Sequence, residues 1–133
     1  MSWHVADYAS VEFEQREPRE GEAEGRHAAD LTGKLELKSS RARLWRYPPG
    51  TTGRRHADRA QEEVFVVVAG AMTMLLGDPP TRVDVGQGSV VAVEPGTPLQ
   101  VRNESDEELL VYIYGAPPEQ AGADFFPDVP LPS

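Results

Sequence analysis

Between residues 41 and 114 the chain alternates short apolar runs with turn-forming residues, and this pattern is the strongest constraint on its fold. β-branched and aromatic residues fill the runs, and Gly, Pro or Asp separate them at close intervals. No apolar stripe of helical spacing extends over four turns in this stretch. The predicted strands are 42–47, 63–69, 72–76, 82–85, 89–93, 99–103 and 109–114. Many short antiparallel strands hide their edges by closing on themselves or by stacking as two sheets, so a small all-β barrel or jelly roll is predicted.

The segment before this stretch has a different composition. Residues 12–27 contain six Glu and three Arg with few apolar side chains, which is typical of a solvated loop. The apolar residues on its two sides suggest two short edge strands. These residues are Trp3, Val5, Tyr8 and Val11 before the loop and Leu31, Leu35 and Leu37 after it.

At 133 residues the chain has room for one domain with a substantial core. Its proline-rich tail is predicted to be irregular, with Phe125 and Phe126 docking the tail on the body. The expected organisation is an N-terminal extension at 1–40, a barrel at 41–115 and a tail at 116–133.

Charge and composition narrow the expected partners and location. Thirteen Lys and Arg against twenty-two Asp and Glu give a net charge of −9, which repels nucleic acid phosphates and anionic lipid headgroups. The longest largely apolar run, 64–72, is shorter than the roughly 20 residues of a membrane-spanning helix. The first residues lack the basic start and apolar region of a secretory signal, and the chain has no Cys. We therefore expect a cytoplasmic protein without nucleic acid or membrane partners.

Two motifs follow each other inside the predicted barrel. In the first, five, one, four and six residues separate Gly50, His56, Asp58, Glu63 and Gly70. The second is the run GSVVAVEPGTPLQVRN, with glycines at positions 88 and 96 and an asparagine at 103. Together they make residues 41–115 resemble the cupin family. The resemblance implies a small cupin-like β-barrel, the double-stranded β-helix of jelly-roll type.

The resemblance also implies a ligand set, from which this chain departs at two positions. In the family, three His and one Glu hold a divalent ion such as manganese, iron, zinc or nickel. His56 and Glu63 match two of these positions, whereas Asp58 and Leu99 stand where the pattern has His. Gln100 points to the opposite face of its strand unless a bulge shifts the register.

Two interpretations of the altered set remain open. His56 and Asp58 are two residues apart and share one face of a strand, and Glu63 can return to the same pocket after a turn. These three side chains either form a polar cluster without metal under a ligand-sized cavity, or hold one divalent cation at a site poor in nitrogen, which favours manganese or magnesium over zinc. Leu99 makes one wall apolar, which favours an organic ligand and no tightly bound cofactor.

Six arginines lie within nineteen residues of this acidic chain: Arg41, Arg43, Arg46, Arg54, Arg55 and Arg59. They either hold a carboxylate or phosphate of a ligand at the mouth of the barrel, or pair with surface carboxylates. Arg41 and Arg43 share one face of their strand, and Arg46 lies on the other. The predicted ligand pocket consists of His56, Asp58, Glu63, Leu99 and Arg46.

The predicted function is binding or sensing of a small organic molecule in the barrel, or metal-free acid–base catalysis by Glu63 and His56. The alternative is a metal-dependent oxygenase, isomerase or decarboxylase with His56, Asp58 and Glu63 as ligands. A third possibility is a barrel that only associates with a partner protein. Family members commonly dimerise by exchanging N-terminal strands, so the resemblance also implies a homodimer. Fold resemblance does not name a substrate.

Overall fold

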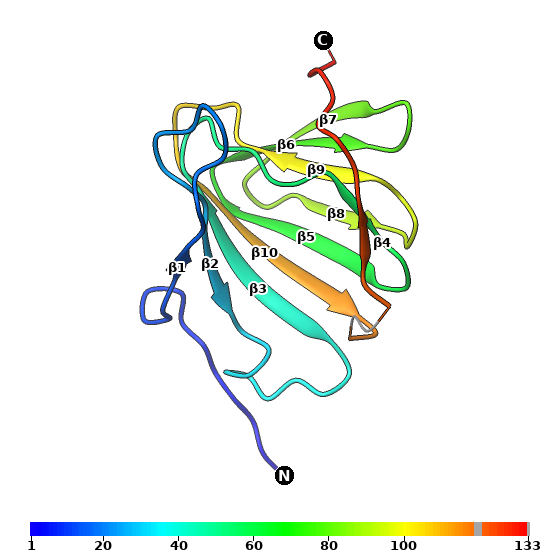
Figure 1. Ribbon diagram of the computed structural model, residues 1–133. Coiled ribbons are helices and arrows are strands. Elements are labelled where there is room, and N and C mark those ends of the chain that lie inside the picture. The colour runs from blue at the N-terminus through cyan, green and yellow to red at the C-terminus, as the bar shows by residue number, and fades with distance from the viewer. Residues whose placement is uncertain (119–120, 133) are drawn as a thin grey trace.

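The computed structural model describes residues 1–118 and 121–132 and consists of two β-sheets that face each other (Figure 1). The first sheet contains β1 (Glu14–Gln15), β2 (His27–Asp30), β3 (Arg41–Tyr47), β5 (Glu62–Ala69), β8 (Val90–Val93) and β10 (Leu109–Ala116). The second contains β4 (His56–Asp58), β6 (Ala71–Leu76), β7 (Thr81–Gly86), β9 (Leu99–Arg102) and β11 (Ala123–Phe125). No helix among the described residues has the length and apolar character needed to cross a membrane.

The strand order is β1-β2-β3-β10-β5-β8 in one sheet and β11-β4-β9-β6-β7 in the other. Neighbouring strands are antiparallel, including pairs that are distant in sequence such as β3 with β10 and β4 with β9. The all-β jelly-roll prediction is therefore confirmed. All seven predicted strands are present, as β3 and β5 to β10.

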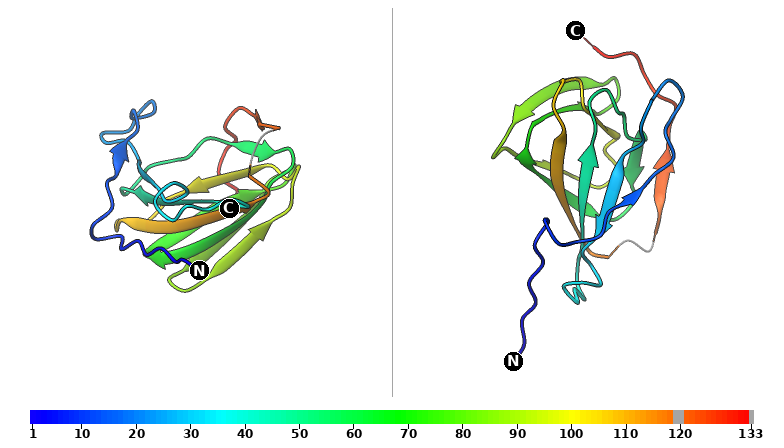
Figure 2. Two further views of the ribbon diagram at one scale, coloured as in Figure 1. Left: turned by 90° about the horizontal axis from the view of Figure 1, so that it is seen from below. Right: turned by 90° about the vertical axis from the view of Figure 1, so that its left-hand side faces the viewer.

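The N-terminal region differs from its prediction. Residues 1–12 form no strand. Figure 2 shows the N-terminal end of the chain extending away from the two sheets, whereas Ala6 and Val11 pack against the first sheet. Trp3 is 78% exposed, because no neighbouring strand in the described chain pairs with this segment. Within the predicted loop 12–27, the short strand β1 pairs with β2.

The second predicted edge strand is also wrong. The strand is β2, directly before Leu31, and residues 32–36 form turns. The reason is local hydrogen bonding: the Asp30 carboxylate accepts the backbone N–H of Thr32, and Leu31 O accepts that of Leu35. Leu31 is nevertheless buried, in a cluster with Leu44 on the face of the first sheet that points away from the second.

The tail is more regular than predicted. Ala123–Phe125 forms β11, which pairs with β4 and covers an edge that would otherwise lack a partner. Phe125 and Phe126 contact the body as expected, because the Arg54 and Arg55 guanidinium groups lie over their rings. Residues 119, 120 and 133 of the predicted tail lie outside the described part. Both flanks of the predicted barrel therefore contribute strands, β2 and β11.

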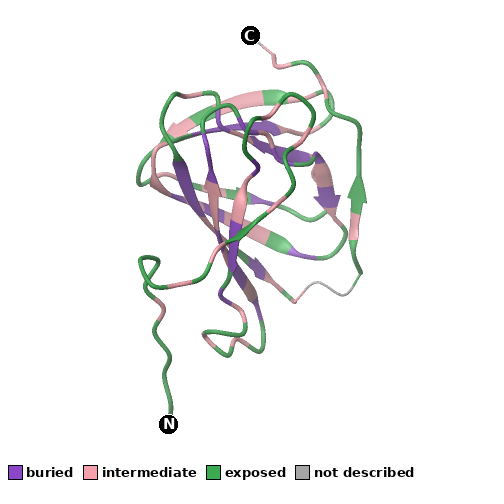
Figure 3. Cartoon of the chain, turned by 60° about the vertical axis from the view of Figure 1, so that its left-hand side comes forward, coloured by how far each residue is buried: buried purple, intermediate pink, exposed green. Residues whose placement is uncertain are grey.

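The main core fills the space between the two sheets. Figure 3 shows buried segments along the middle strands of both. The inward side chains include Phe65 and Val67 of β5, Met72 and Met74 of β6, and Val111 of β10. Along β3 the exposure alternates, so Leu44 and Trp45 lie on opposite faces. This alternation brings the odd-numbered residues of β3 to the interior.

Gly70, in the turn between β5 and β6, is a position where a side chain should be strongly destabilising. Its φ is +85°, and a Cβ would collide with the Glu108 carbonyl oxygen and lie 3.0 Å from the Leu109 Cα. We expect Gly70→Ala to lower the free energy of unfolding by more than about 2 kcal/mol, the combined effect of a left-handed backbone and overpacking. Chemical denaturation measures this loss.

Gly88→Ala is the matched control, because its φ is +87° and nothing lies within 4 Å of the added Cβ. Its free energy of unfolding should fall by only about 1–2 kcal/mol, the cost of placing a side chain on a left-handed backbone. Equal losses in the two variants would contradict the close approach of β10 to Gly70.

Candidate functional site

A cavity of about 360 Å³ lies between the two sheets. Strands β3, β5 and β10 line it from one sheet, and β4, β9 and β11 from the other. Its apolar wall includes Trp45, Tyr47, Phe65, Leu99 and Val101. The volume falls within the range of about 300–1,000 Å³ that is usual for small-molecule pockets.

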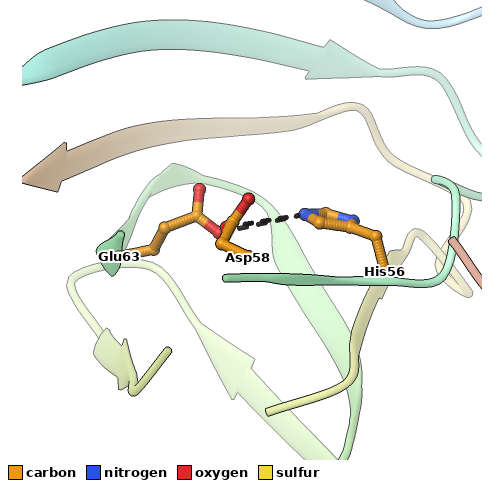
Figure 4. A group of neighbouring side chains, drawn as sticks. All are labelled: His56, Asp58 and Glu63. Carbon is orange, nitrogen blue, oxygen red and sulfur yellow. Dashed lines mark ion pairs between the residues drawn. The ribbon is translucent and has the colours of Figure 1, made fainter. Parts of the chain in front are cut away.

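His56, Asp58 and Glu63 form the polar cluster of this cavity (Figure 4). His56 and Asp58 project from the same face of β4, on either side of the buried Ala57, and Glu63 projects from the start of β5. His56 Nε2 lies 3.8 Å from Asp58 Oδ2 and 3.9 Å from Glu63 Oε1. The three side chains therefore converge, as their spacing in the sequence predicts.

Interactions within the cluster shift the pKa values of His56 and Glu63 in opposite directions. Burial lowers the pKa of His56, but interactions with Glu63, the Arg54 carbonyl and Asp58 outweigh burial and raise it above its usual value. Burial raises the pKa of Glu63, but interactions with His56 and Asp58 and the charge of Arg41 outweigh burial and lower it. The cluster thus favours an ionised Glu63 beside a protonated His56.

The tautomer of a neutral His56 follows from its backbone contact. Its Nδ1 lies 3.1 Å from the Arg54 carbonyl oxygen. A carbonyl oxygen can only accept, so Nδ1 carries the proton and donates it. Nε2 then faces the two carboxylates with its lone pair, and is available to a ligand or a cation.

Leu99 lies directly across from His56 in the pairing of β9 with β4. It is 2% exposed and lines the cavity. The next residue, Gln100, points elsewhere: its side-chain Nε2 donates to the Gly53 carbonyl and to Asp128, 3.0 Å from each acceptor. No bulge therefore brings Gln100 into the cavity, and its wall at this position is apolar.

Arg46 does not line the cavity, although it belongs to the predicted pocket set. It lies on the outer face of β3, where its Nη2 is 3.0 Å from a Glu108 carboxylate oxygen. Alternation along the strand sends Arg41 and Arg43 inward and Arg46 outward. Strand alternation separates these two faces from the sequence alone, but it does not show which of them lines the cavity.

The arginines divide into two groups. Eleven of the thirteen basic residues are arginines, and all eleven are described. Seven lie within 4.0 Å of a carboxylate: Arg16, Arg19, Arg46, Arg55, Arg59, Arg82 and Arg102. The other four, Arg26, Arg41, Arg43 and Arg54, all line the cavity. Pairing with carboxylates thus accounts for half of the sequence cluster, namely Arg46, Arg55 and Arg59.

Arg26 is a cavity residue that the sequence did not reveal. It lies just before β2, within the segment predicted to be a solvated loop. Its guanidinium lies 4.9 Å from the centroid of the Trp45 ring and 5.5 Å from that of Tyr47. The pairing of β2 with β3 brings Arg26 next to these rings, and nothing in the local sequence signals that pairing.

Comparison with known proteins identifies related folds. The family model of the Cupin domain matches residues 43–114. Polyketide cyclase RemF from Streptomyces resistomycificus superposes with a TM-score of 0.74 and 17% identity, over 91% of this chain and 83% of that one. A predicted oxalate decarboxylase from Thermotoga maritima gives a TM-score of 0.72 and 16% identity, over 84% and 97% of the chains.

A sugar phosphate isomerase of the cupin superfamily from Silicibacter pomeroyi gives a TM-score of 0.71 and 22% identity, over 84% of this chain and 74% of that one. No curated protein matches the chain. At these identities the three solved structures support the fold alone. Their names specify three different reactions, so the shared fold does not determine the chemistry of this cavity.

Proposed function

This chain belongs to the Cupin domain family, and from that premise we propose that its barrel cavity binds a small organic molecule. The composition of the cavity carries the proposal: apolar and aromatic side chains surround one polar cluster, the combination typical of small-molecule sites. Leu99 in particular offers carbon rather than a donor atom directly across from His56. The ligand would place its apolar body against this wall and a polar group near the cluster.

The same cavity offers one acid–base pair. His56 and Glu63 face each other, with pKa values shifted in the directions that keep the imidazole protonated and the carboxylate ionised. A bound molecule beside them would meet a proton donor and a proton acceptor within the same cluster. This pair supports either orientation of a polar ligand group or proton transfer to and from it.

A divalent metal ion is the second candidate, because one donor atom from each of His56, Asp58 and Glu63 lies within 4.8 Å of the other two. The hydrogen bond from Nδ1 to the Arg54 carbonyl orients the imidazole as in many metal sites. Glu63 Oε1 is buried and accepts no hydrogen bond from the described residues. These donors fit a hard cation such as manganese or magnesium, which would polarise a ligand oxygen when bound.

Two measurements on one preparation separate the candidates. We expect chelator-treated protein to be stabilised by members of a library of small carboxylates and sugars, with a shift of several degrees in Tm at about 100-fold excess over Kd. Elemental analysis of protein purified without added metal tests the second candidate. Near-stoichiometric manganese, magnesium, iron, zinc or nickel that is lost in a His56→Ala variant would support it.

The outcomes remain distinct because each candidate has its own readout. If no library compound raises Tm in either the metal-free or the metal-loaded protein, the organic-ligand proposal is wrong. If metal is present at wild-type level in His56→Ala, the ion is bound elsewhere, and the cluster is not its site.

A further inference from the structure

Resting on the proposed function, we propose that the ligand of the cavity is an organic anion, with an aromatic or other flat apolar body and a carboxylate or phosphate group held by Arg41, Arg43, Arg54 and Arg26. The arginines that line the cavity differ from the others in their ion pairing. Every arginine within 4.0 Å of a carboxylate lies outside the cavity lining, and the four that line it have no such partner among the described residues.

A shortage of carboxylates does not explain why the four cavity arginines lack an ion pair. Carboxylates outnumber basic residues by twenty-two to thirteen in the chain. Even so, four arginines line the cavity with only two carboxylate residues, Asp58 and Glu63. The cavity therefore carries positive charge inside an acidic protein, whether or not His56 is protonated. An entering anion would be attracted to it and would balance this charge.

Arg43 has the clearest need for a counter-ion. Burial lowers its pKa, and so do the charges of Arg41 and, less strongly, Arg16, while Asp30 and Glu63 only partly compensate. Guanidinium groups stay charged at physiological pH despite such shifts. The unfavourable environment of Arg43 therefore persists in the free protein, and a carboxylate or phosphate beside it would relieve the repulsion from Arg41.

Aromatic rings hold two of these arginines in place of carboxylates. The Arg54 guanidinium lies 3.8 Å from the centroid of the Phe125 ring, and that of Arg26 lies over Trp45 and Tyr47. A guanidinium stacked on a ring keeps the N–H groups at its edge available to an oxyanion. The apolar wall that includes Phe65 and Leu99 is suited to the rest of the molecule.

Trp45 makes binding directly measurable. The chain has two tryptophans, and Trp3 lies on the exposed N-terminal segment. In a Trp3→Phe background the tryptophan fluorescence therefore comes from Trp45 in the cavity alone. Suitable probes are benzoate, cinnamate and phenyl phosphate, with benzamide and cinnamamide as neutral counterparts of the two carboxylates. Isothermal titration calorimetry provides a second, independent measure of affinity.

We expect the anions to bind at least about tenfold more tightly than the amides, and the binding to weaken as salt is added. Arg43→Met and Arg54→Met should each weaken anion binding about 10- to 100-fold, the usual range for losing a charge-assisted hydrogen bond. Arg46→Met is the matched control, since it removes the same charge from the outer face of the same strand as Arg43. It should bind like the parent protein.

Each contrary outcome has its own meaning. Amides that bind as tightly as carboxylates, or anion binding that Arg43→Met and Arg54→Met both leave unchanged in folded protein, would overturn the anion assignment and leave the organic-ligand proposal intact. If no probe, charged or neutral, changes the Trp45 signal or Tm at about 10 mM, a concentration at which even millimolar Kd values register, the proposal of an aromatic anion is wrong. The organic-ligand proposal is wrong as well only if the library of carboxylates and sugars also leaves Tm unchanged. A preference for phenyl phosphate over benzoate would identify phosphate as the group recognised.

Discussion

Replacing Leu99 with His is expected to raise the affinity of the cavity for zinc or nickel by about 100-fold. Leu99 is the cross-strand partner of His56 and lines the same cavity, so an imidazole there would add a fourth donor to three that already converge. Four-ligand zinc sites bind with about 10–16 kcal/mol, or about 3 kcal/mol per ligand, and each 1.4 kcal/mol is about tenfold in affinity. Zinc and nickel are the appropriate probes because both favour imidazole.

Calorimetric titration of chelator-treated protein measures the gain. Val90→His is the control, because Val90 is 62% exposed on β8 and does not line the cavity. This variant adds the same side chain without adding a donor to the cluster. Its affinity for zinc or nickel should therefore equal that of the parent protein. A folded Leu99→His variant with unchanged affinity would show that this wall does not face the position where an ion would lie.

The fold could be predicted where the sequence carries a local signal. Alternating β-branched and aromatic residues identify β3 and the strands from β5 to β10. Strand β2 carries no such signal, since its sequence is HAAD, and it exists because Ala29 pairs with Leu44 of β3. The reverse holds at the N-terminus, where Trp3 and Val5 favour a strand but pair with no strand in the described part of the chain. Pairing is a long-range property, so residue preference alone fails at both places.

The candidate site divides in the same way. His56, Asp58 and Glu63 lie within eight residues and converge. Strand geometry predicts that His56 and Asp58 share a face, and the short turn after them allows Glu63 to return to the same pocket. The position of Arg26 depends on a long-range contact, because the pairing of β2 with β3 brings it next to Trp45 and Tyr47. Charge clustering in the sequence therefore included Arg46 and missed Arg26. The homodimer expected from the family resemblance stays a prediction.

Truncating Phe65 to Ala should cost about 3–5 kcal/mol of unfolding free energy, the usual penalty for removing a buried phenylalanine ring. Phe65 is 1% exposed, in the centre of β5, where its neighbours are Ile113 of β10 and Val91 of β8. Its side chain belongs to the main core and also lines the ligand cavity. Removing the ring would extend an existing cavity rather than create an isolated one, and denaturant unfolding measures the cost.

Phe125→Ala is the control, because this phenylalanine is 54% exposed on β11 and lines the same cavity from its other side. Its loss should cost less than about 1 kcal/mol, since little surface is removed from the core. If Phe65→Ala also costs less than about 1.5 kcal/mol, the two sheets must close over the vacated space, because the penalty grows with the cavity that remains. The cavity would then depend on Phe65 to hold the sheets apart, and the same variant should lose affinity for benzoate.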